Sequence, residues 1–389
     1  MTITPTADIV IIGAGVHGCS LAFHLAQAGA GRIVLVEKKH VAAGPTAQSG
    51  AMIRALFTEP IYVDLVMAST RIFEQWNEIV GGDAGFVQCG FLRITDTLAP
   101  DVIGGDLELT RRAGEPYKIL SGDQLARLVP AGQFTEAEFG VLFPNAGYAD
   151  PYKTTVELAN AAKREGVVIH EGVKVTSIRV DDSGVSAVKT DRGTIATPLI
   201  VNCAGAWSEQ VASMAGIQLP IEKQPAPTCL FRKPNSMTAS GPILSDGVNK
   251  VYLRAQGDSL YRAAHFGHAL EAVDVDNYDE TVPAHQLRML RDGLFERYGD
   301  MRRTPYLGGF TALYDMTPDG HPIVGVSESV EGFWNDCGWS GNGFAPAMAS
   351  SRSLAQMIMG SEPEIDLSFF HWPRSSDIAP RLHQDWVHQ

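Results

Sequence analysis

The sequence has few cysteines and no pattern that would pair them. Its five cysteines, Cys19, Cys89, Cys203, Cys229 and Cys337, include no Cys-x-x-Cys pair. An odd, scattered set is typical of a reducing compartment and not of a disulfide framework. No run of Lys and Arg occurs, and the net charge of -13 argues against nucleic-acid binding, which requires clustered cations. We therefore expect free thiols and no nucleic-acid partner.

Long hydrophobic runs are also missing. The apolar run near the N-terminus follows no basic segment and is too short for a signal peptide or a membrane span, so we expect a cytoplasmic protein without a membrane partner. No His, Cys or carboxylate spacing matches a zinc site, so we expect no metal. The 389 residues exceed what one hydrophobic core usually organises, so we expect two domains.

A glycine-rich turn follows the first predicted strand. Residues 13–18, GAGVHG, place Gly13, Gly15 and Gly18 in the GxGxxG spacing between an apolar run and a predicted helix. The first glycine permits the tight turn, the second lets backbone amides approach a pyrophosphate, and the third lets helix and strand pack closely. Glu37, at the end of the second predicted strand, can accept both ribose hydroxyls. This context predicts a dinucleotide site; glycines serving only a tight turn are the alternative.

The next segment favours FAD over NAD. An NAD enzyme would continue with regular βαβ units, whereas residues 44–54, GPTAQSGAMIR, form a loop of small and polar residues soon after the second strand. Such a loop can lie along the ribityl chain and pyrophosphate of a flavin. Further on, residues 194–205 form a nearly continuous apolar run that ends at Gly205 and predicts a strand covered on both faces of a parallel sheet.

Six motifs in this order give the chain a family resemblance. They are GAGVHG (13–18), VEKKHVAAGPTAQSGAMIR (36–54), GYADPYKTTVELANAAKREGV (147–167), VNCAGAWS (201–208), YDMTPDGHPIVG (314–325) and CGWSGNGFAPAM (337–348). Together they resemble the D-amino-acid-oxidase-type FAD-dependent oxidoreductases, in the branch of sarcosine oxidase, dimethylglycine dehydrogenase and glycine oxidase. The resemblance implies an α/β fold: a Rossmann-like FAD-binding domain of discontinuous segments and an α+β substrate domain with a large mixed or antiparallel sheet.

The resemblance also implies where the domains divide. The FAD-binding domain is expected at residues 1–83, 147–214 and 315–365, the substrate domain at 84–146 and 215–314, and a C-terminal tail at 366–389.

It further implies a set of cofactor-binding residues. Those expected at the AMP half, the pyrophosphate and the flavin are Gly13, Gly15, Val16, His17, Gly18, Glu37, Lys38, Gln48, Ser49, Gly50, Met52, Val175, Ala204, Gly205, Gly338, Gly341, Asn342, Gly343 and Phe344. For Val175 and Ala204, plain strand core is an equal alternative.

Two residues are candidates for the chemistry. The resemblance implies that Arg54 faces the substrate, where a planar guanidinium can bind an anion; an ordinary surface cation is the alternative. A lysine of the oxidases, which helps the reduced flavin meet oxygen, has its nearest counterpart at Tyr261 in SLYRAAH. The electron acceptor is therefore either oxygen or another molecule.

Departures from the family pattern give further predictions. The cysteine that bonds covalently to flavin in monomeric sarcosine oxidases is replaced by Ala312, and the corresponding histidine of dimethylglycine dehydrogenases by Gln48, so we expect FAD to bind non-covalently. The lysine that binds the substrate carboxylate in sarcosine oxidases is replaced here by Ala345. We therefore expect a substrate other than sarcosine itself, either larger or differently charged.

The resulting prediction is an FAD-dependent enzyme that oxidises the C–N bond of a secondary or tertiary amine. Hydride transfer from an N-methyl or cyclic amino-acid-like substrate to the flavin would give an imine that water hydrolyses. Alternatives are a 2-hydroxy-acid or D-amino-acid dehydrogenase, or a non-catalytic flavoprotein subunit of a larger complex. A homo-oligomer or a partner subunit is possible on either reading.

The glycines near the C-terminus have a predicted role of their own. Gly338, Gly341 and Gly343 would let the backbone pass against the flavin, and the following helix would direct its N-terminal amides at negative charge there. A tight turn before a packing helix is the alternative.

Overall fold

A parallel sheet with one antiparallel edge forms the half of the fold that contains the N-terminus. The computed structural model describes residues 3–99, 103, 105–237, 241–266 and 271–374. The sheet order is β18-β19-β12-β1-β2-β8, and only β18 runs antiparallel to its neighbour. The strands are β1 (Ile9–Ile12), β2 (Ile33–Glu37), β8 (Val168–Glu171), β12 (Ile200–Asn202), β18 (Ile323–Val326) and β19 (Phe333–Cys337). Their apolar side chains are almost all buried, as the continuous hydrophobic runs predict.

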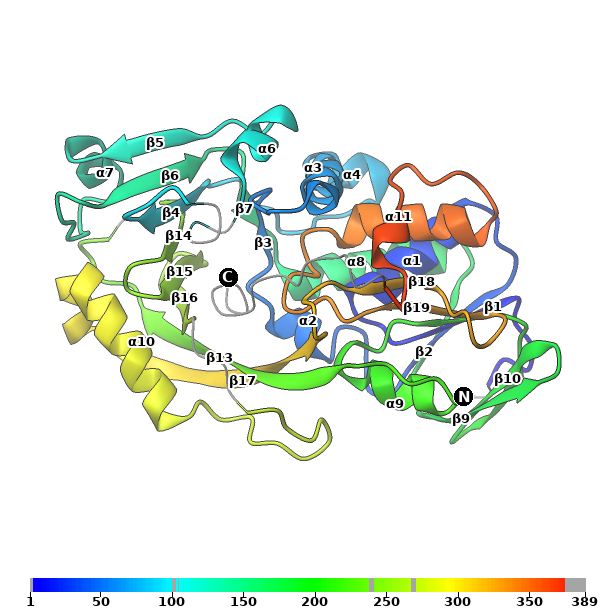
Figure 1. The fold of residues 1–389 in the computed structure, drawn as a ribbon. Helices are drawn as coiled ribbons and strands as arrows, with labels where there is room; N and C mark the ends of the chain where they lie inside the picture. Colours follow the sequence, from blue (N-terminus) through cyan, green and yellow to red (C-terminus); the bar gives the residue numbers. More distant parts are fainter. Residues whose placement is uncertain (1–2, 100–102, 104, 238–240, 267–270, 375–389) are drawn as a thin grey trace.

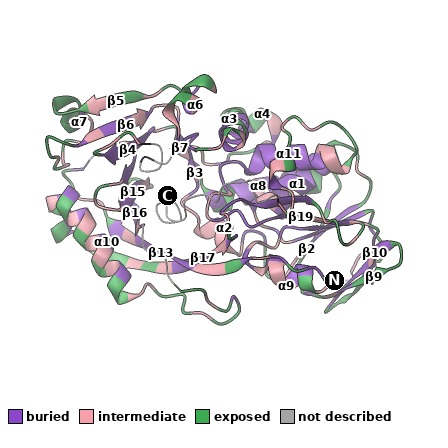
Figure 2. Ribbon diagram, in the orientation of Figure 1, coloured by how far each residue is buried: buried purple, intermediate pink, exposed green. Residues whose placement is uncertain are grey.

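Helices cover one face of this sheet and a small sheet covers the other. Figure 1 shows α1 (Val16–Gln27), α8 (Pro151–Arg164) and α11 (Ala347–Ile358) side by side, with α3 (Pro60–Glu74) packed on α11. The other face packs on β9 (Val175–Asp181), β10 (Gly184–Thr190) and β11 (Gly193–Ala196), with α9 (Ser208–Ser213) beside them. The six-stranded sheet is therefore buried on both faces, as Figure 2 shows.

The second half is a mixed eight-stranded sheet. Its order is β17-β13-β16-β15-β14-β4-β6-β5, with β14 and β4 parallel and the other neighbours antiparallel. The strands are β4 (Phe91–Thr95), β5 (Lys118–Ser121), β6 (Phe139–Phe143), β13 (Glu222–Arg232), β14 (Ile243–Asp246), β15 (Val251–Gln256), β16 (Leu260–His265) and β17 (Tyr306–Met316). Helix α10 (Ala284–Arg297) packs on β15 and β16 from one side. The opposite face is left for the cavity described below.

Short elements complete the described chain. They are α2 (Pro45–Gln48), α4 (Trp76–Ile79), α6 (Leu107–Arg112), α7 (Asp123–Leu128), the paired strands β3 (Met52–Ile53) and β7 (Gly147–Tyr148), and the 3-10 helices η1 (Gly205–Trp207), η2 (Gly299–Arg303) and η3 (Ser368–Phe370). No helix in the described ranges combines the length and the apolar character that a membrane crossing requires.

The two sheets follow the expected α/β and α+β arrangement, and their strands fall within the expected segments with one difference. The long pair β13 and β17 runs from the eight-stranded sheet toward the other half (Figure 1), and β17 continues two residues past 314, where we expected a boundary. The division into two domains stays a prediction. Of the expected tail, residues 375–389 lie outside the described residues, whereas Leu367 and Phe370 are buried and Arg374 bonds the carboxylate of Asp319.

A buried ion cluster fastens α10 to the large sheet. The guanidinium of Arg297 donates to both oxygens of Asp246 on β14 and to both oxygens of Glu138, and all three side chains are buried. Each ionised group keeps a charged partner, which is the condition under which buried charges are tolerated.

Removing one member of this cluster leaves buried charge without a partner. We expect Arg297→Met to lower the free energy of unfolding by about 3–5 kcal/mol in a urea titration. The matched control is Arg302→Met, which removes an exposed pair with Glu296 and should cost less than about 1 kcal/mol. Equal losses in the two variants would contradict the assignment of α10 docking to the buried cluster.

Candidate active site

The turn after β1 forms one end of the main cavity. Gly13 has a φ of 106°, and a Cβ there would lie 2.5 Å from the carbonyl oxygen of Cys203. A Cβ on Gly18 would lie 2.0 Å from the carbonyl oxygen of Gly13, so α1 can approach β1 only with glycine at this position. The N-terminus of α1 therefore opens directly into the cavity, which Gly13, Gly15 and Val16 line. This is the arrangement that the GxGxxG spacing predicts.

Glu37 stands at the end of β2 on the cavity wall. One carboxylate oxygen accepts the N–H of Ala14 at 3.0 Å and the other accepts the N–H of Lys39 at 2.8 Å. These bonds fix the carboxylate beside the glycine turn. An immobile acceptor at this place is what recognition of a ribose hydroxyl requires.

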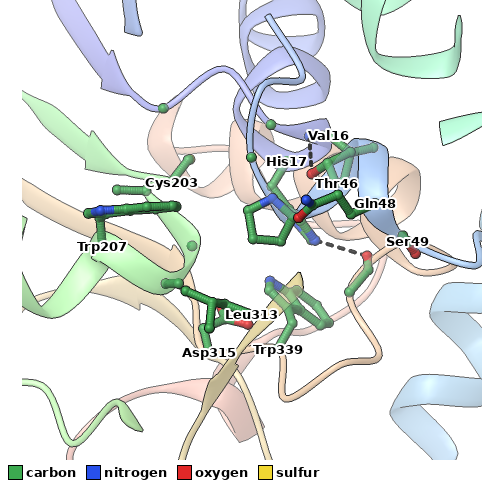
Figure 3. Close-up of a pocket in the computed structure, with 18 of the residues that line it drawn as sticks. Val16, His17, Thr46, Gln48, Ser49, Cys203, Trp207, Leu313, Asp315 and Trp339 are labelled. Atoms are coloured by element: carbon green, nitrogen blue, oxygen red, sulfur yellow. Dashed lines mark hydrogen bonds between the residues drawn. The ribbon is translucent and has the colours of Figure 1, made fainter. Parts of the chain in front are cut away.

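The loop after β2 forms a second wall. The hydroxyl of Thr46 on α2 accepts the N–H of Val16 at 3.3 Å, which ties α2 to the start of α1 (Figure 3). Gln48, Ser49, Gly50, Met52 and Arg54 follow, and all of them line the cavity.

At the far end, a contact network joins the two halves of the molecule. The ammonium of Lys38 lies 3.5 Å from the centre of the Trp207 ring, and the indole N–H of Trp207 donates to Asp276 at 2.8 Å. Hydrogen bonding from Trp207 lowers the pKa of Asp276 despite partial burial, so this residue is a carboxylate at neutral pH. Val175 and Ala204 also line the cavity, and their contact with a cofactor stays a prediction.

The C-terminal glycine-rich loop faces the start of α1. The ring nitrogen Nδ1 of His17 lies 3.1 and 3.2 Å from the two oxygens of Asp336, and Nε2 lies 2.9 Å from the carbonyl oxygen of Gly343. The ring also stacks on Trp339, whose indole N–H donates to Asp336 at 2.8 Å. Both nitrogens of His17 thus face acceptors, an arrangement that favours the doubly protonated imidazolium.

The electrostatics agree with this protonation state. Burial alone lowers the pKa of His17, but the adjacent Asp336 carboxylate and the Gly343 carbonyl outweigh burial, and the net pKa is raised. Burial raises the pKa of Asp315, which accepts the N–H of Gly338 at 2.7 Å.

Most of the expected cofactor residues line one cavity. Gly341, Asn342, Gly343 and Phe344 lie on its wall, together with Lys38 and Gly205. Gly338 and Gly18 lie behind the wall: a Cβ on Gly338 would meet Thr317 at 2.7 Å, and Gly18 serves the contact between α1 and β1. α11 begins at Ala347, after the loop residues that line the cavity.

Tyr261 requires a correction. We expected it beside the flavin, but it belongs to the hydrophobic cluster on the α10 side of the large sheet and lines a separate small cavity with Tyr298 and Met237. Side chains alternate along a strand, so the neighbouring Arg262 points to the opposite face of the large sheet. Arg262 donates to the carbonyl oxygens of Gln48 and Ser49, both on the cavity wall.

Several lining residues were missed by the sequence reasoning. Ala226, Thr228 and Tyr252 come from the large sheet, as do Leu313, Tyr314 and Asp315 on β17, whereas Trp207 comes from η1 and Asp276 from a loop. Figure 3 shows Trp207 and Leu313 on the side of the cavity opposite Gln48 and Ser49. The alternation of VYLRA (251–255) could have placed Tyr252 and Arg254 on one face of a strand. It could not have shown which side of the sheet that face lies on.

The cavity suits a dinucleotide with a flavin. Its lining includes residues 173–175, next to Glu37, and residues 341–345, next to His17, together with Gly13 and Gly15. A Cβ on Gly15 would lie 3.0 Å from the Thr46 hydroxyl, so a side chain there would crowd this part of the wall. Glu37 and the free amides of α1 supply the groups that ribose and pyrophosphate require.

Comparison with known proteins agrees with this geometry. Residues 8–357 match the family described as FAD dependent oxidoreductase, abbreviated DAO. The chain belongs to this family. Sarcosine dehydrogenase of Mus musculus is 28% identical over 384 residues, which are 93% of this chain and 40% of that protein. Sarcosine oxidase subunit beta of Arthrobacter sp is 25% identical over 372 residues, which are 91% of this chain and 87% of that subunit.

Solved structures show the same fold. The L-proline dehydrogenase of P.horikoshii superposes with a TM-score of 0.87 at 24% identity, covering 95% of this chain and 97% of that one. The chain spans about two fifths of the length of the sarcosine dehydrogenase that it matches.

The imidazolium state of His17 can be measured directly. We expect ¹⁵N NMR near pH 6 to show protons on both ring nitrogens of His17. His24 on the same helix is a matched reference, because burial lowers its pKa to about 3 and keeps it neutral. A raised folded-state pKa stabilises the protein fully below the unfolded value of about 6.5, and this contribution is lost as pH rises through the folded pKa.

Replacement of His17 should therefore have a pH-dependent effect. We expect the stability difference between the native chain and His17→Gln to be largest below about pH 6.5 and to shrink as the pH rises through the folded pKa. A neutral imidazole spectrum at pH 6, or a stability difference independent of pH, would contradict the imidazolium assignment.

Proposed function

We propose that this FAD-dependent oxidoreductase oxidises the C–N bond of a secondary or tertiary amine that also carries a carboxylate. Bound FAD would supply the acceptor for a hydride from the carbon next to nitrogen. The resulting imine would hydrolyse in water. The named activities of relatives, sarcosine dehydrogenase and sarcosine oxidase subunit beta, support an amine substrate.

The observation that carries this proposal is the placement of Arg54. Arg54 is 4% exposed and lines the cavity, and its guanidinium carbon lies 5.1 Å and 5.4 Å from the ring centres of Phe57 and Phe91. Its Nη1 donates to the carbonyl oxygen of Leu56 at 2.8 Å, which fixes the direction of the fork. A fixed, desolvated guanidinium is well suited to hold a substrate carboxylate in one orientation.

Tyrosines of the large sheet would complete the substrate side. Tyr252 and Tyr314 line the cavity, and burial raises the pKa of Tyr314, so its hydroxyl stays protonated. A neutral phenol can donate a hydrogen bond without adding charge beside an amine that must bind as its free base. The catalytic roles of Arg54 and of these phenols are proposals.

We also propose that FAD binds without a covalent bond. Ala312 and Gln48, which stand where relatives carry attachment residues, both line the cavity and neither side chain is a suitable nucleophile. Among the described lining residues the one cysteine is Cys203, and burial raises its pKa well above the ordinary value, which keeps it from acting as a thiolate.

The electron acceptor and the assembly are further proposals. Oxygen or another acceptor could reoxidise the flavin, and the similarity to a sarcosine oxidase subunit supports a partner subunit as an alternative to a homo-oligomer. A cytoplasmic location stays a prediction from the sequence.

Non-covalent FAD makes a simple prediction. Acid precipitation of the holoenzyme should leave the yellow colour in the supernatant, because unfolding releases a ligand that no bond retains. Ala312→Cys is an informative companion variant, since it restores the relatives' residue at this position. A yellow pellet from the native chain would refute non-covalent binding.

The amine proposal is tested by anaerobic bleaching of the flavin. We expect N-methyl or cyclic amino acids to bleach the holoenzyme, and Arg54→Met to weaken bleaching at low substrate concentration at least about tenfold, because a charged hydrogen bond is lost. Arg232→Met, an exposed residue of β13, is the matched control. Bleaching by a 2-hydroxy acid alone would replace the amine proposal with the hydroxy-acid alternative.

A further inference from the structure

Two arginines lie directly opposite each other on the cavity face of the large sheet. Arg254 on β15 pairs with Arg262 on β16 in the antiparallel ladder. Like charges at paired positions repel, so this arrangement is unfavourable unless something negative lies between or above them. Leu253, the neighbour of Arg254 in sequence, faces α10, so both arginines point to the opposite side.

Both side chains are buried and incompletely bonded. Arg254 is 2% exposed and Arg262 is 7% exposed, and the Nε of each has no hydrogen-bond partner among the described residues. Arg254 donates to its neighbour Ala255 and lies 4.4 Å from the centre of the Tyr148 ring. Leaving a buried charged donor unsatisfied is costly, which points to a missing acceptor.

No carboxylate of the described residues neutralises the pair. Neither guanidinium has an Asp or Glu oxygen within 4.0 Å among the described ion pairs, whereas the buried Arg297 has two such partners. Asp150 acts on both only through its electric field, and its side chain is engaged at the start of α8. Burial lowers the pKa of both arginines, to about 10 for Arg254, as expected for cations without a counter-ion.

The pair belongs to the same row of the sheet as the Arg54 site. Phe91 on β4 pairs with Ile243 on β14, and continuing the β14–β15 register by one residue sets Ile243 beside Arg254. Arg54 lies over Phe91, two strands from Arg254, which is about 10 Å along the sheet. Three guanidiniums therefore lie along one row of paired residues in the large sheet. Arg54 forms one group, and Arg254 and Arg262 form the other.

The pair lies directly beside residues that line the cavity. Arg262 donates to the carbonyl oxygens of Gln48 and Ser49, which line it, and Tyr148 under Arg254 pairs with the lining residue Met52. A ligand held by Arg54 at one end can thus extend toward the pair.

We propose that Arg254 and Arg262 form a second anion subsite, which binds an additional acidic group of the substrate. The inference rests on the proposed function in taking Arg54 as the site of the first carboxylate. The substrate class is then an amine with two carboxylates, one on Arg54 and one on the opposed pair. A carboxylate between two guanidiniums accepts from both and removes their mutual repulsion.

The test compares two unreactive ligands of one length on the holoenzyme. Glutarate carries two carboxylates, and glutaramate replaces one of them with a neutral amide. Binding is followed by the change in the visible absorption of the bound flavin, without turnover. We expect glutarate to bind at least about tenfold more tightly, the scale of one charge-assisted hydrogen bond. Equal affinities in the native chain overturn the proposal.

Variants identify the subsite. Arg262→Met and Arg254→Met should each lower the preference for glutarate about tenfold, whereas Arg262→Lys should keep part of it. Arg54→Met should weaken both ligands alike and leave their ratio unchanged, and Arg232→Met is the control on the same sheet. A preference that survives loss of either opposed arginine overturns the assignment.

The outcomes separate this inference from the proposed function. Bleaching by amines with no glutarate preference removes the second subsite and leaves amine oxidation standing. A glutarate preference that depends on the pair, without bleaching by any amine, supports the subsite and removes the proposed reaction.

Discussion

The close approach of three backbone segments is the constraint on which the site depends. A Cβ on Gly13 would meet the Cys203 carbonyl at 2.5 Å and one on Gly18 would meet the Gly13 carbonyl at 2.0 Å. These distances are shorter than van der Waals contact, so β1, α1 and the end of β12 come together only with glycine. Since the strands are parallel, their carboxyl ends share one edge, and this edge becomes the cavity mouth. The other walls of the cavity are built around this edge of the sheet.

His17 links the start of α1 to a segment that lies far along the chain. Its ring joins Asp336 and Gly343, which are 319 and 326 residues away in sequence. A buried ion pair adds little net stability compared with apolar packing, because desolvation offsets attraction. Its effect here is geometric: the two ring nitrogens of His17 contact Asp336 and Gly343 in fixed directions, which restricts where residues 336–343 can lie. The glycine-rich loop is thereby held against the cofactor cavity by a residue of the dinucleotide motif itself.

The sequence reasoning succeeded where the information is local. The strand, turn and helix around Gly13, Gly15 and Gly18 follow from spacing alone, and Glu37 follows from its place at the end of the next strand. It failed at Tyr261, because alternation along β16 defines two faces without saying which one α10 covers. That choice depends on pairing with β13 and β15 and on packing against a helix that follows later in the chain. The contact of Trp207 with Asp276 was equally out of reach, since it joins η1 to a loop 69 residues away in sequence.

Three buried arginines at or beside the cavity are opposite in sign to the charge of the whole chain. The net charge is -13, so the long-range field repels an anionic ligand and slows its approach. Asp336 on β19 is paired with His17, whereas Arg54 lines the cavity and Arg254 and Arg262 lie on the cavity-side face of the large sheet. An anionic substrate would therefore gain its affinity from short-range guanidinium contacts made after entry. Substrates should then be discriminated by their dissociation rates. Ligands of equal charge experience the same long-range electric field and differ only in the guanidinium groups that they contact.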